Sequence, residues 1–344
     1  MLRFIIKRLG LLVILLFGIS LLVFIISHMV PSNPVASSLS QAAMNDPKIV
    51  AAFEAKWGLD KPLPEQYLIY LDHLVHGDLG TSIRTQRPVI EDLKRFYPAT
   101  LELSIFAIIF SLVFGILFGV LSAVFRNKWP DQVLRGISVS GVSIPSFWLS
   151  LLVLSYFGTI LRWFPVGGRL NSRAIVPTGG SGLYVFDGLT SGNFHLMSDA
   201  LSHLILPALV LGFFTMGLIT RQTRSNLLEV MSADYIRTAR AKGMSGFRVV
   251  VQHALPNALI PVITVSGLGF ANLLGGMVFV ENIFAWPGIG QYAYQSAISL
   301  DFPAICGVSM LIALNYVVIN LIVDILYGVI DPRIRIRQEG GDTA

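Results

Sequence analysis

The sequence predicts an all-α membrane protein with six transmembrane helices. Its mean hydropathy is +0.69, and 13% of its 344 residues are charged, about half the share of roughly 25% that is usual in soluble domains. A helix of about 20 apolar residues crosses a bilayer core of about 30 Å. Six runs reach that length, at 9–30, 100–125, 137–161, 201–220, 258–280 and 304–330. They contain two acidic residues, Glu102 and Asp324, and no Lys or Arg.

The first run follows a basic start, with Arg3, Lys7 and Arg8. Its apolar part exceeds the roughly 7–15 residues of a cleaved signal peptide, so we expect an uncleaved first span. Of the 25 Lys and Arg residues, 15 lie in four segments that total 70 residues, at 1–8, 126–136, 221–257 and 331–344. The three remaining segments hold 10 in 131 residues. Because cytoplasmic loops are enriched in Lys and Arg, both chain ends are expected in the cytoplasm.

The first external segment, 31–99, is expected to form short helices that cap the outer surface. One helix is predicted over 46–57, ending at Gly58, and a second over 64–76, ending at Gly77, because glycine readily takes the left-handed conformation that stops a helix. A third is predicted over 88–97, up to Pro98. The second external loop, 162–200, is rich in Gly and Ser and predicts no regular element.

The longest inside loop, 221–257, predicts two helices. The first spans 232–242, with Ser232 as its N-cap and Asp234 near its positive end. Gly243 is expected to stop it in the left-handed region. The second carries apolar residues at spacings of three and four, and ends near Leu255 and Pro256; these residues are Phe247, Val250, Val251 and Ala254. By pattern, both could also be ordinary amphipathic connectors.

This loop resembles a cytoplasmic motif of binding-protein-dependent ABC permeases, E-A-A-x3-G-x9-I-x-L-P. Here Arg-Thr-Ala at 237–239 is followed by Gly243 and by His-Ala-Leu-Pro at 253–256. Asp-Tyr-Ile-Arg-Thr-Ala-Arg-Ala-Lys-Gly, at 234–243, is similar to the variant of dipeptide, oligopeptide and nickel permeases. Further matching segments are Leu-Asp-Lys-Pro at 59–62, Gly-Asp-Leu-Gly at 77–80, Ala-Thr-Leu-Glu-Leu at 99–103, Ser-Ile-Pro-Ser-Phe-Trp at 143–148, Phe-Ala-Trp-Pro-Gly at 284–288 and Asp-Pro-Arg at 331–333. Pro-Ser-Asn-Pro at 31–34 departs from the family's frequent Pro-Gly-Asp-Pro.

The resemblance implies a type I ABC importer permease of the bacterial inner membrane. Its pore would form with a paralogous second permease, above two ATP-binding cassette subunits that hold ATP and Mg²⁺, with solute delivered by an external solute-binding protein. No cofactor or metal is expected in this chain. The implied organisation is an N-terminal helix at 1–30, an external segment at 31–99, a permease core at 100–330 and a cytoplasmic tail at 331–344.

In this family, the helix at 232–242 would be the coupling helix that sits in a groove of the ATPase. The residues expected to serve that contact are Asp234, Tyr235, Arg237, Thr238, Ala239, Arg240, Lys242, Gly243, Leu255 and Pro256. Ala239 and Gly243 are small where a partner would approach closely. Arg237, Arg240 and Lys242 could pair with acidic groups of that partner.

Four polar residues within the spans are candidates for the translocation path. Glu102 follows Pro98 by four residues, where a carboxylate also complements a helix dipole. Ser309, Asn320 and Asp324 share a face of the last span, and Asn315 does not. That face could line the pore or bond helices together. Gly115 and Gly119 predict close helix packing, and Pro145, Pro207 and Pro261 predict kinks in three spans.

Several other functions lack their motifs. The net charge of +5 does not indicate nucleic acid, because the basic residues lie in short pieces between apolar runs. The chain has no G-x4-G-K-[ST] phosphate loop, so an ATPase would be another subunit, and it has no G-x-S-x-G nucleophile motif. We therefore expect a transport subunit and not an enzyme. Dipeptides are the expected solute, with oligopeptides, nickel chelates and glutathione as alternatives, and a secondary transporter as the remote one.

Overall fold

The computed structural model describes residues 2–29, 44–174 and 179–330. Its regular elements there are helices, beside one isolated β-bridge between Thr81 and Pro88. The tail at 331–344, the Asp-Pro-Arg within it and the Pro-Ser-Asn-Pro at 31–34 lie outside the described residues. In chain order the elements are α1 (Leu2–Met29), α3 (Pro47–Trp57), α4 (Leu63–Val75), α5 (Val89–Val124), α6 (Trp129–Ser143), α7 (Ser146–Val153), the π-helical η1 (Leu154–Ile160), α8 (Tyr184–Thr190), α9 (Phe194–Val230), α10 (Asp234–Ala241), α11 (Gly246–Arg248), the π-helical η2 (Val249–Ala254), α12 (Leu255–Ala258), α13 (Ile260–Leu274), α14 (Val278–Ile283), α15 (Ile289–Ile298) and α16 (Phe302–Ile330).

Three of the described helices, α5, α9 and α16, are each long and apolar enough to cross a membrane. The number rises to five if each of two bent pairs is one span. In α1, the apolar stretch within the described part is the shorter Val13–Ile26. All six predicted runs are helical over most of their length, but two are not straight single helices.

The predicted third span, 137–161, is broken. Trp129–Ser143 and Ser146–Ile160 meet at 107°, because Pro145 has no N–H to continue the helix and leaves Ile144 extended. The predicted fifth span, 258–280, ends early at Leu274, and Gly276 takes a left-handed φ of +79° before α14 begins. A bend of 55° also separates Gly246–Ala258 from α13.

Pro98 does not end a helix, so the prediction of a separate helix at 88–97 is wrong. α5 runs through it from Val89 to Val124. An internal proline costs a helix about 3 kcal/mol. Buried side chains on both sides of it, among them Leu93, Ala99 and Leu103, pack into the core and outweigh that cost.

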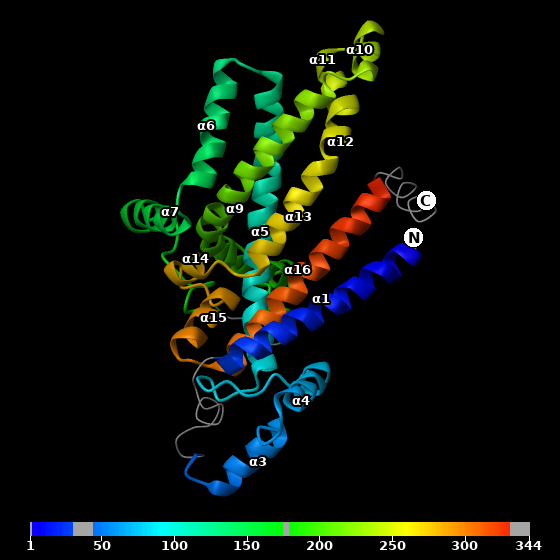
Figure 1. The fold of residues 1–344 in the computed structure, drawn as a ribbon. Helices are drawn as coiled ribbons and strands as arrows, with labels where there is room; N and C mark the ends of the chain where they lie inside the picture. The colour runs from blue at the N-terminus through cyan, green and yellow to red at the C-terminus, as the bar shows by residue number, and fades with distance from the viewer. Residues whose placement is uncertain (1, 30–43, 175–178, 331–344) are drawn as a thin grey trace.

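α5 and α9 form the centre of the molecule, with α6 and α7 on one side and α16 and α1 on the other (Figure 1). The prediction that Gly115 and Gly119 mark a close contact is confirmed. A Cβ on Gly115 would lie 2.7 Å from Ile219, and one on Gly119 would lie 2.5 Å from Thr223. Only glycine allows α9 to approach α5 this closely.

The two ends of the bundle carry different elements. α10 and α11 lie at one end, and α3 and α4 lie at the other (Figure 1). α3 and α4 match the predicted short helices, and Gly58 and Gly77 take left-handed φ values of +61° and +75°. α4 is fixed to α1 by a 2.9 Å hydrogen bond between Tyr67 and Ser20.

Candidate functional site

α10 lies in the loop that the sequence singles out. The helix spans Asp234–Ala241 rather than 232–242. The predicted N-cap role of Ser232 is wrong: Ala233 holds that position, and the Ser232 hydroxyl donates to the Glu229 carbonyl at 2.7 Å. Gly243 takes the predicted left-handed stop, with φ +76° and no atom within 4 Å of a Cβ placed there.

One face of α10 packs on its own chain. Ile236 is fully buried and Ala239 is 7% exposed. Both join a cluster built from the ends of α5 and α9 and from the helices that follow α10, whose buried members are Ala123, Leu227, Ile236, Ala239, Val249, Val250, Ala254 and Ala258. The small side chain of Ala239 therefore suits this packing, and Gly243 remains the small residue that is open to a partner.

The opposite face of α10 is open to solvent. Its exposed members are Asp234, Tyr235, Arg237, Thr238 and Arg240, with Lys242 just beyond. Arg237 lies 3.3 Å from Asp234, and both side chains are largely exposed. Such a pair contributes at most about 1 kcal/mol, so both charges are free to exchange partners. The structure thus presents a firmly seated helix with an exposed, charged outer face.

The second predicted helix is present but divided. Residues 246–258 are helical through α11, η2 and α12. Val250 and Ala254 pack into the cluster beneath α10, while Phe247 and Val251 are exposed. The expected single apolar face is therefore wrong, because the π-helical turn rotates residues away from the regular spacing. Beyond it, Leu255 is half-buried and Pro256 is exposed at the start of α12.

A buried ion pair that the sequence did not reveal lies near this loop. Asp131, in the first turn of α6, is fully buried. Arg224 of α9 donates to both of its oxygens, each at 2.9 Å. Ser122 of α5 and the N–H of Asn127 complete its shell at 2.5 and 2.9 Å. The two charges are 93 residues apart, so no local spacing pointed to them; a signal available in the sequence was an acidic residue directly after a Trp-Pro helix start.

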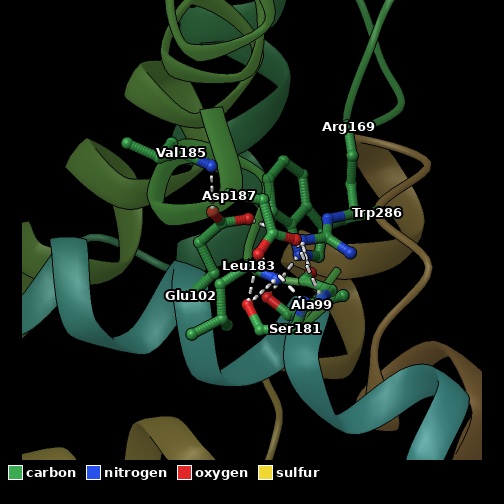
Figure 2. A network of polar contacts seen from close by, with 9 residues as sticks. Ala99, Glu102, Arg169, Ser181, Leu183, Val185, Asp187 and Trp286 are labelled. Carbon is green, nitrogen blue, oxygen red and sulfur yellow. Dashed lines mark hydrogen bonds and ion pairs between the residues drawn. The ribbon is translucent and has the colours of Figure 1, made fainter. Parts of the chain in front are cut away.

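Glu102 lies in the N-terminal half of α5, within a polar network (Figure 2). Its carboxylate accepts from Arg169 at 2.5 Å and from the Val185 N–H at 2.8 Å. Arg169 also donates to the Gly182 carbonyl and lies 3.9 Å from the ring centroid of Tyr184. The expected place in a first helical turn is wrong, because α5 continues through the preceding proline.

The same network orders the loop that the sequence left without structure. Asp187 accepts from the N–H groups of Ser181 and Gly182, at 2.9 and 3.0 Å. Trp286 donates its indole N–H to the Ala99 carbonyl at 2.9 Å, as Figure 2 shows. Glu102 is 3% exposed and both its oxygens are occupied. These contacts favour a structural role for it over a place in a solute path.

A second buried carboxylate near this network belongs to Glu281 of α14. It accepts from the Thr100 hydroxyl at 2.9 Å and from the Gln291 N–H at 2.8 Å. Burial raises the pKa of Glu281 to about 7, because desolvation outweighs the hydrogen bonds that favour the charged form. It therefore titrates near neutral pH.

The polar residues of α16 are spread along the helix. Ser309 donates to the Ile305 carbonyl at 2.9 Å, within its own helix. Asn320 and Asp324 are half-buried. Asn315, predicted to point elsewhere, is buried and accepts from the Tyr97 hydroxyl at 2.9 Å. Helix-to-helix bonding is thus seen at Asn315, which the sequence had set apart from the other three.

A cavity of about 250 Å³ lies at the break between α6 and α7. It is mostly apolar and is lined by Gly141, Val142, Ile144, Pro145, Ser146, Leu149, Val210, Leu211, Phe214 and Met277. α9 closes one side of it, and the residue before α14 closes another. Among the described residues, no group of three or more His, Cys, Asp or Glu side chains is placed to hold a metal ion.

Two family models match the chain. The model described as "Binding-protein-dependent transport system inner membrane component" matches residues 115–336. The model described as "Binding-prot-dependent transport system membrane comp, N-term" matches residues 1–104. Together they include every helix discussed above except the middle of α5.

Relatives match over nearly the full length. The probable D,D-dipeptide transport system permease protein of Escherichia coli K12 is 48% identical over 323 residues, or 94% of each chain. The dipeptide transport system permease protein of Alkalihalophilus pseudofirmus is 44% identical, over 97% of this chain and 100% of the relative. A chain of the inward-facing MetNI methionine ABC transporter shares the fold, with a TM-score of 0.51, 20% identity, and coverage of 70% of this chain and 96% of its own.

Proposed function

Since this chain belongs to the family of binding-protein-dependent transport system inner membrane components, we propose that it forms part of the pore of an ATP-driven bacterial importer for short peptides. The family is one of membrane transport subunits, so the chain is not an enzyme. Dipeptides are the proposed solute. Oligopeptides, nickel chelates and glutathione remain alternatives for the same architecture.

The likeness to dipeptide permeases carries the substrate proposal. The two relatives described above are named for dipeptide transport, and they align with this chain over at least 94% of its length. A match of that extent supports the same order of segments in this chain as in those relatives. The relatives therefore support the proposed solute, while the exposed charged face of α10 supports the proposed coupling contact.

The proposed partners are a paralogous permease, two ATP-binding cassette subunits that hold ATP and Mg²⁺, and an external solute-binding protein. α10 would enter a groove of one ATPase. Its charged outer face offers Arg237, Arg240 and Lys242 to acidic groups, while Gly243 allows close approach. Because Ile236 seats the helix on the bundle, a push on α10 would move the ends of α5 and α9 with it.

The proposed topology has six spans, with both termini in the cytoplasm. α1, the two bent pairs, α5, α9 and α16 would each cross the membrane once. The start of α1 and the end of α16 lie towards the end of the bundle that carries α10, and α3 and α4 lie towards the other (Figure 1). The excess of Lys and Arg on the α10 side supports the same orientation. Labelling of single cysteines by an impermeant reagent in sealed cells would contradict it if α10 reacted and α4 did not.

Transport itself can be measured in proteoliposomes that contain the whole complex. We expect ATP-dependent uptake of labelled alanyl-alanine that requires the solute-binding protein. Comparison of the D,D and L,L forms would assign the preferred stereochemistry. Uptake driven by an ion gradient without ATPase subunits would instead establish a secondary transporter. Uptake of glutathione or a nickel chelate but of neither dipeptide would contradict the proposed substrate and leave the architecture intact.

The face of α16 that carries Ser309, Asn320 and Asp324 remains the proposed polar part of the translocation path. Their partial exposure supports this placement. Asn320→Ala is expected to change the apparent KM for peptide without loss of assembled complex. An unchanged KM and a loss of assembly would indicate helix bonding instead.

A further inference from the structure

The ion pair between Asp131 and Arg224 has no part in the coupling contact described above. Asp131 is fully buried, and the Arg224 side chain is 20% exposed. Arg224 binds both carboxylate oxygens, which fixes the direction of both side chains. The pair is thus a rigid joint between α6 and α9. Because Ser122 also donates to Asp131, the joint includes α5.

This joint adjoins the seat of α10. Arg224 lies one helical turn before Leu227, which is fully buried in the cluster that holds Ile236 and Ala239 of α10. Asn226, between them, donates to the Ala258 carbonyl at 3.1 Å. A displacement of α10 therefore reaches the end of α9 through packed side chains, and it reaches α6 through Asp131.

The C-terminal end of α6 differs from those of its neighbours α5 and α9. α5 and α9 continue as single helices, whereas α6 stops at Ser143 before the extended Ile144 and turns by 107° into α7. Pro145 offers no N–H there, so it donates no backbone hydrogen bond back to α6, while its carbonyl accepts from the Leu149 N–H of α7 at 3.1 Å. The 250 Å³ cavity lies at this turn, between α6, α7 and α9. Space for movement thus exists where α6 meets α7.

We infer that Asp131 and Arg224 are positioning residues that carry the ATP-driven movement of α10 to α6, which then turns about Ile144 and Pro145 and reshapes the cavity beside them. This inference rests on the proposed function, because it takes α10 as the contact with the ATPase. The inference extends the proposed function by a path for this movement, from α10 through α9 to α6. It also implies that α5 and α9 move together as one rigid body.

The first test compares transport with hydrolysis in the reconstituted complex. Asp131→Asn keeps the shape of the side chain and removes its charge. Asp301→Asn is the matched control, because Asp301 is equally buried at the opposite end, where Ser82 donates to it at 2.5 Å. We expect Asp131→Asn to lower alanyl-alanine uptake per ATP hydrolysed about tenfold, within the range of about 5- to 150-fold for coupling between sites. Asp301→Asn should leave that ratio unchanged.

The second test measures distances between spin labels in the complex, with and without ATP. One label replaces exposed Val133 on α6, a second replaces exposed Arg221 on α9, and a third replaces exposed Leu151 on α7. With the pair intact, the α6–α9 distance should stay constant while the α6–α7 distance changes on ATP addition. In Asp131→Asn, the α6–α9 distance should change. Arg224→Lys keeps the positive charge, so it should change the α6–α9 distance less than Asp131→Asn does.

The outcomes separate this inference from the proposed function. If Asp131→Asn lowers assembly, hydrolysis and uptake in equal proportion, or if the α6–α9 distance does not respond in it, the pair is structural and the inference is overturned. If a Gly243→Asp variant retains normal uptake, the assignment of α10 fails instead. The distance measurement needs ATP and no transported solute, so it decides the inference even if dipeptides are not the substrate.

Discussion

A Gly243→Asp substitution places a carboxylate at the end of α10 without disturbing its packed face. Gly243 has φ +76°, and no atom lies within 4 Å of a Cβ built there. The cost within the chain is therefore confined to the backbone, where the left-handed conformation costs about 1–2 kcal/mol for a residue with a Cβ. Folded proteins are stable by about 5–15 kcal/mol. The variant should fold and reach the membrane.

Uptake should nevertheless be lost, because the new charge opposes both the close approach of an ATPase and any acidic groups that face Arg240 and Lys242. We expect wild-type amounts of assembled subunit and a fall in ATP-driven dipeptide uptake of more than about tenfold, which corresponds to about 1.4 kcal/mol. Gly243→Asn is the matched control, since asparagine has nearly the same volume, tolerates the left-handed region and is uncharged. Normal uptake by the Asp variant would refute the reasoning, and an equal loss in the Asn variant would show that size rather than charge matters.

Three further predictions concern stability, measured as the thermal unfolding of the purified protein in detergent. Gly119→Val should separate α5 from α9 and cost about 1–3 kcal/mol, whereas Gly136→Ala, where the space is open, should cost nothing; equal melting of both would contradict the packing. Glu102→Gln should cost up to about 3–5 kcal/mol, because it leaves Arg169 buried without its counter-charge, and adding Arg169→Gln should restore part of the loss; no recovery would contradict the pairing. The pKa of Glu281 is raised from 4.5 to about 7, so the folded state holds this proton more tightly than the unfolded state. The free energy of unfolding should therefore fall as the pH rises from about 4.5 to 7. Glu281→Gln should flatten that fall, and a pH profile unaltered by the substitution would contradict the raised pKa.

The apolar runs were sufficient to predict where most helices lie, because hydropathy and length decide which segments can enter a bilayer. Helix ends marked by local chemistry were also predictable. Gly58, Gly77 and Gly243 all take the left-handed conformation that a glycine after an amphipathic stretch indicates. The predicted N-cap of α10 was wrong, because the Ser232 hydroxyl donates to the Glu229 carbonyl and Ala233 occupies the N-cap position.

Partners distant in sequence were not predictable. Glu102 is unusual as a carboxylate within an apolar run, but its partner Arg169 lies 67 residues away in a loop that has no periodic pattern. In the sequence, Asp131 and Arg224 are charged residues of polar segments, and nothing local links them. The fold pairs them although they are 93 residues apart. A single sequence carries no record of such pairs, because the Coulomb interaction depends on tertiary distance and not on local spacing.

The prolines show that packing decides whether a proline interrupts a helix. Pro98 and Pro207 lie within the unbroken helices α5 and α9, whose neighbouring side chains are buried against each other. Bending either helix would open that contact, so the missing hydrogen bond is tolerated. Pro145 is exposed, and the chain turns by 107° there.

The same contrast indicates which parts of the bundle can move. α5 is held to α9 by the contacts at Gly115 and Gly119. Near its C-terminus, Ser122 donates to Asp131 of the buried pair with Arg224, and in its N-terminal half Glu102 pairs with Arg169 of a loop. Bending α5 or α9 would therefore have to break close helix packing or a buried charge pair, whereas no buried charge pair of the described residues spans the turn between α6 and α7. Movement that enters at α10 is then expected to leave the α5–α9 core intact and to appear where Pro145 already interrupts a helix.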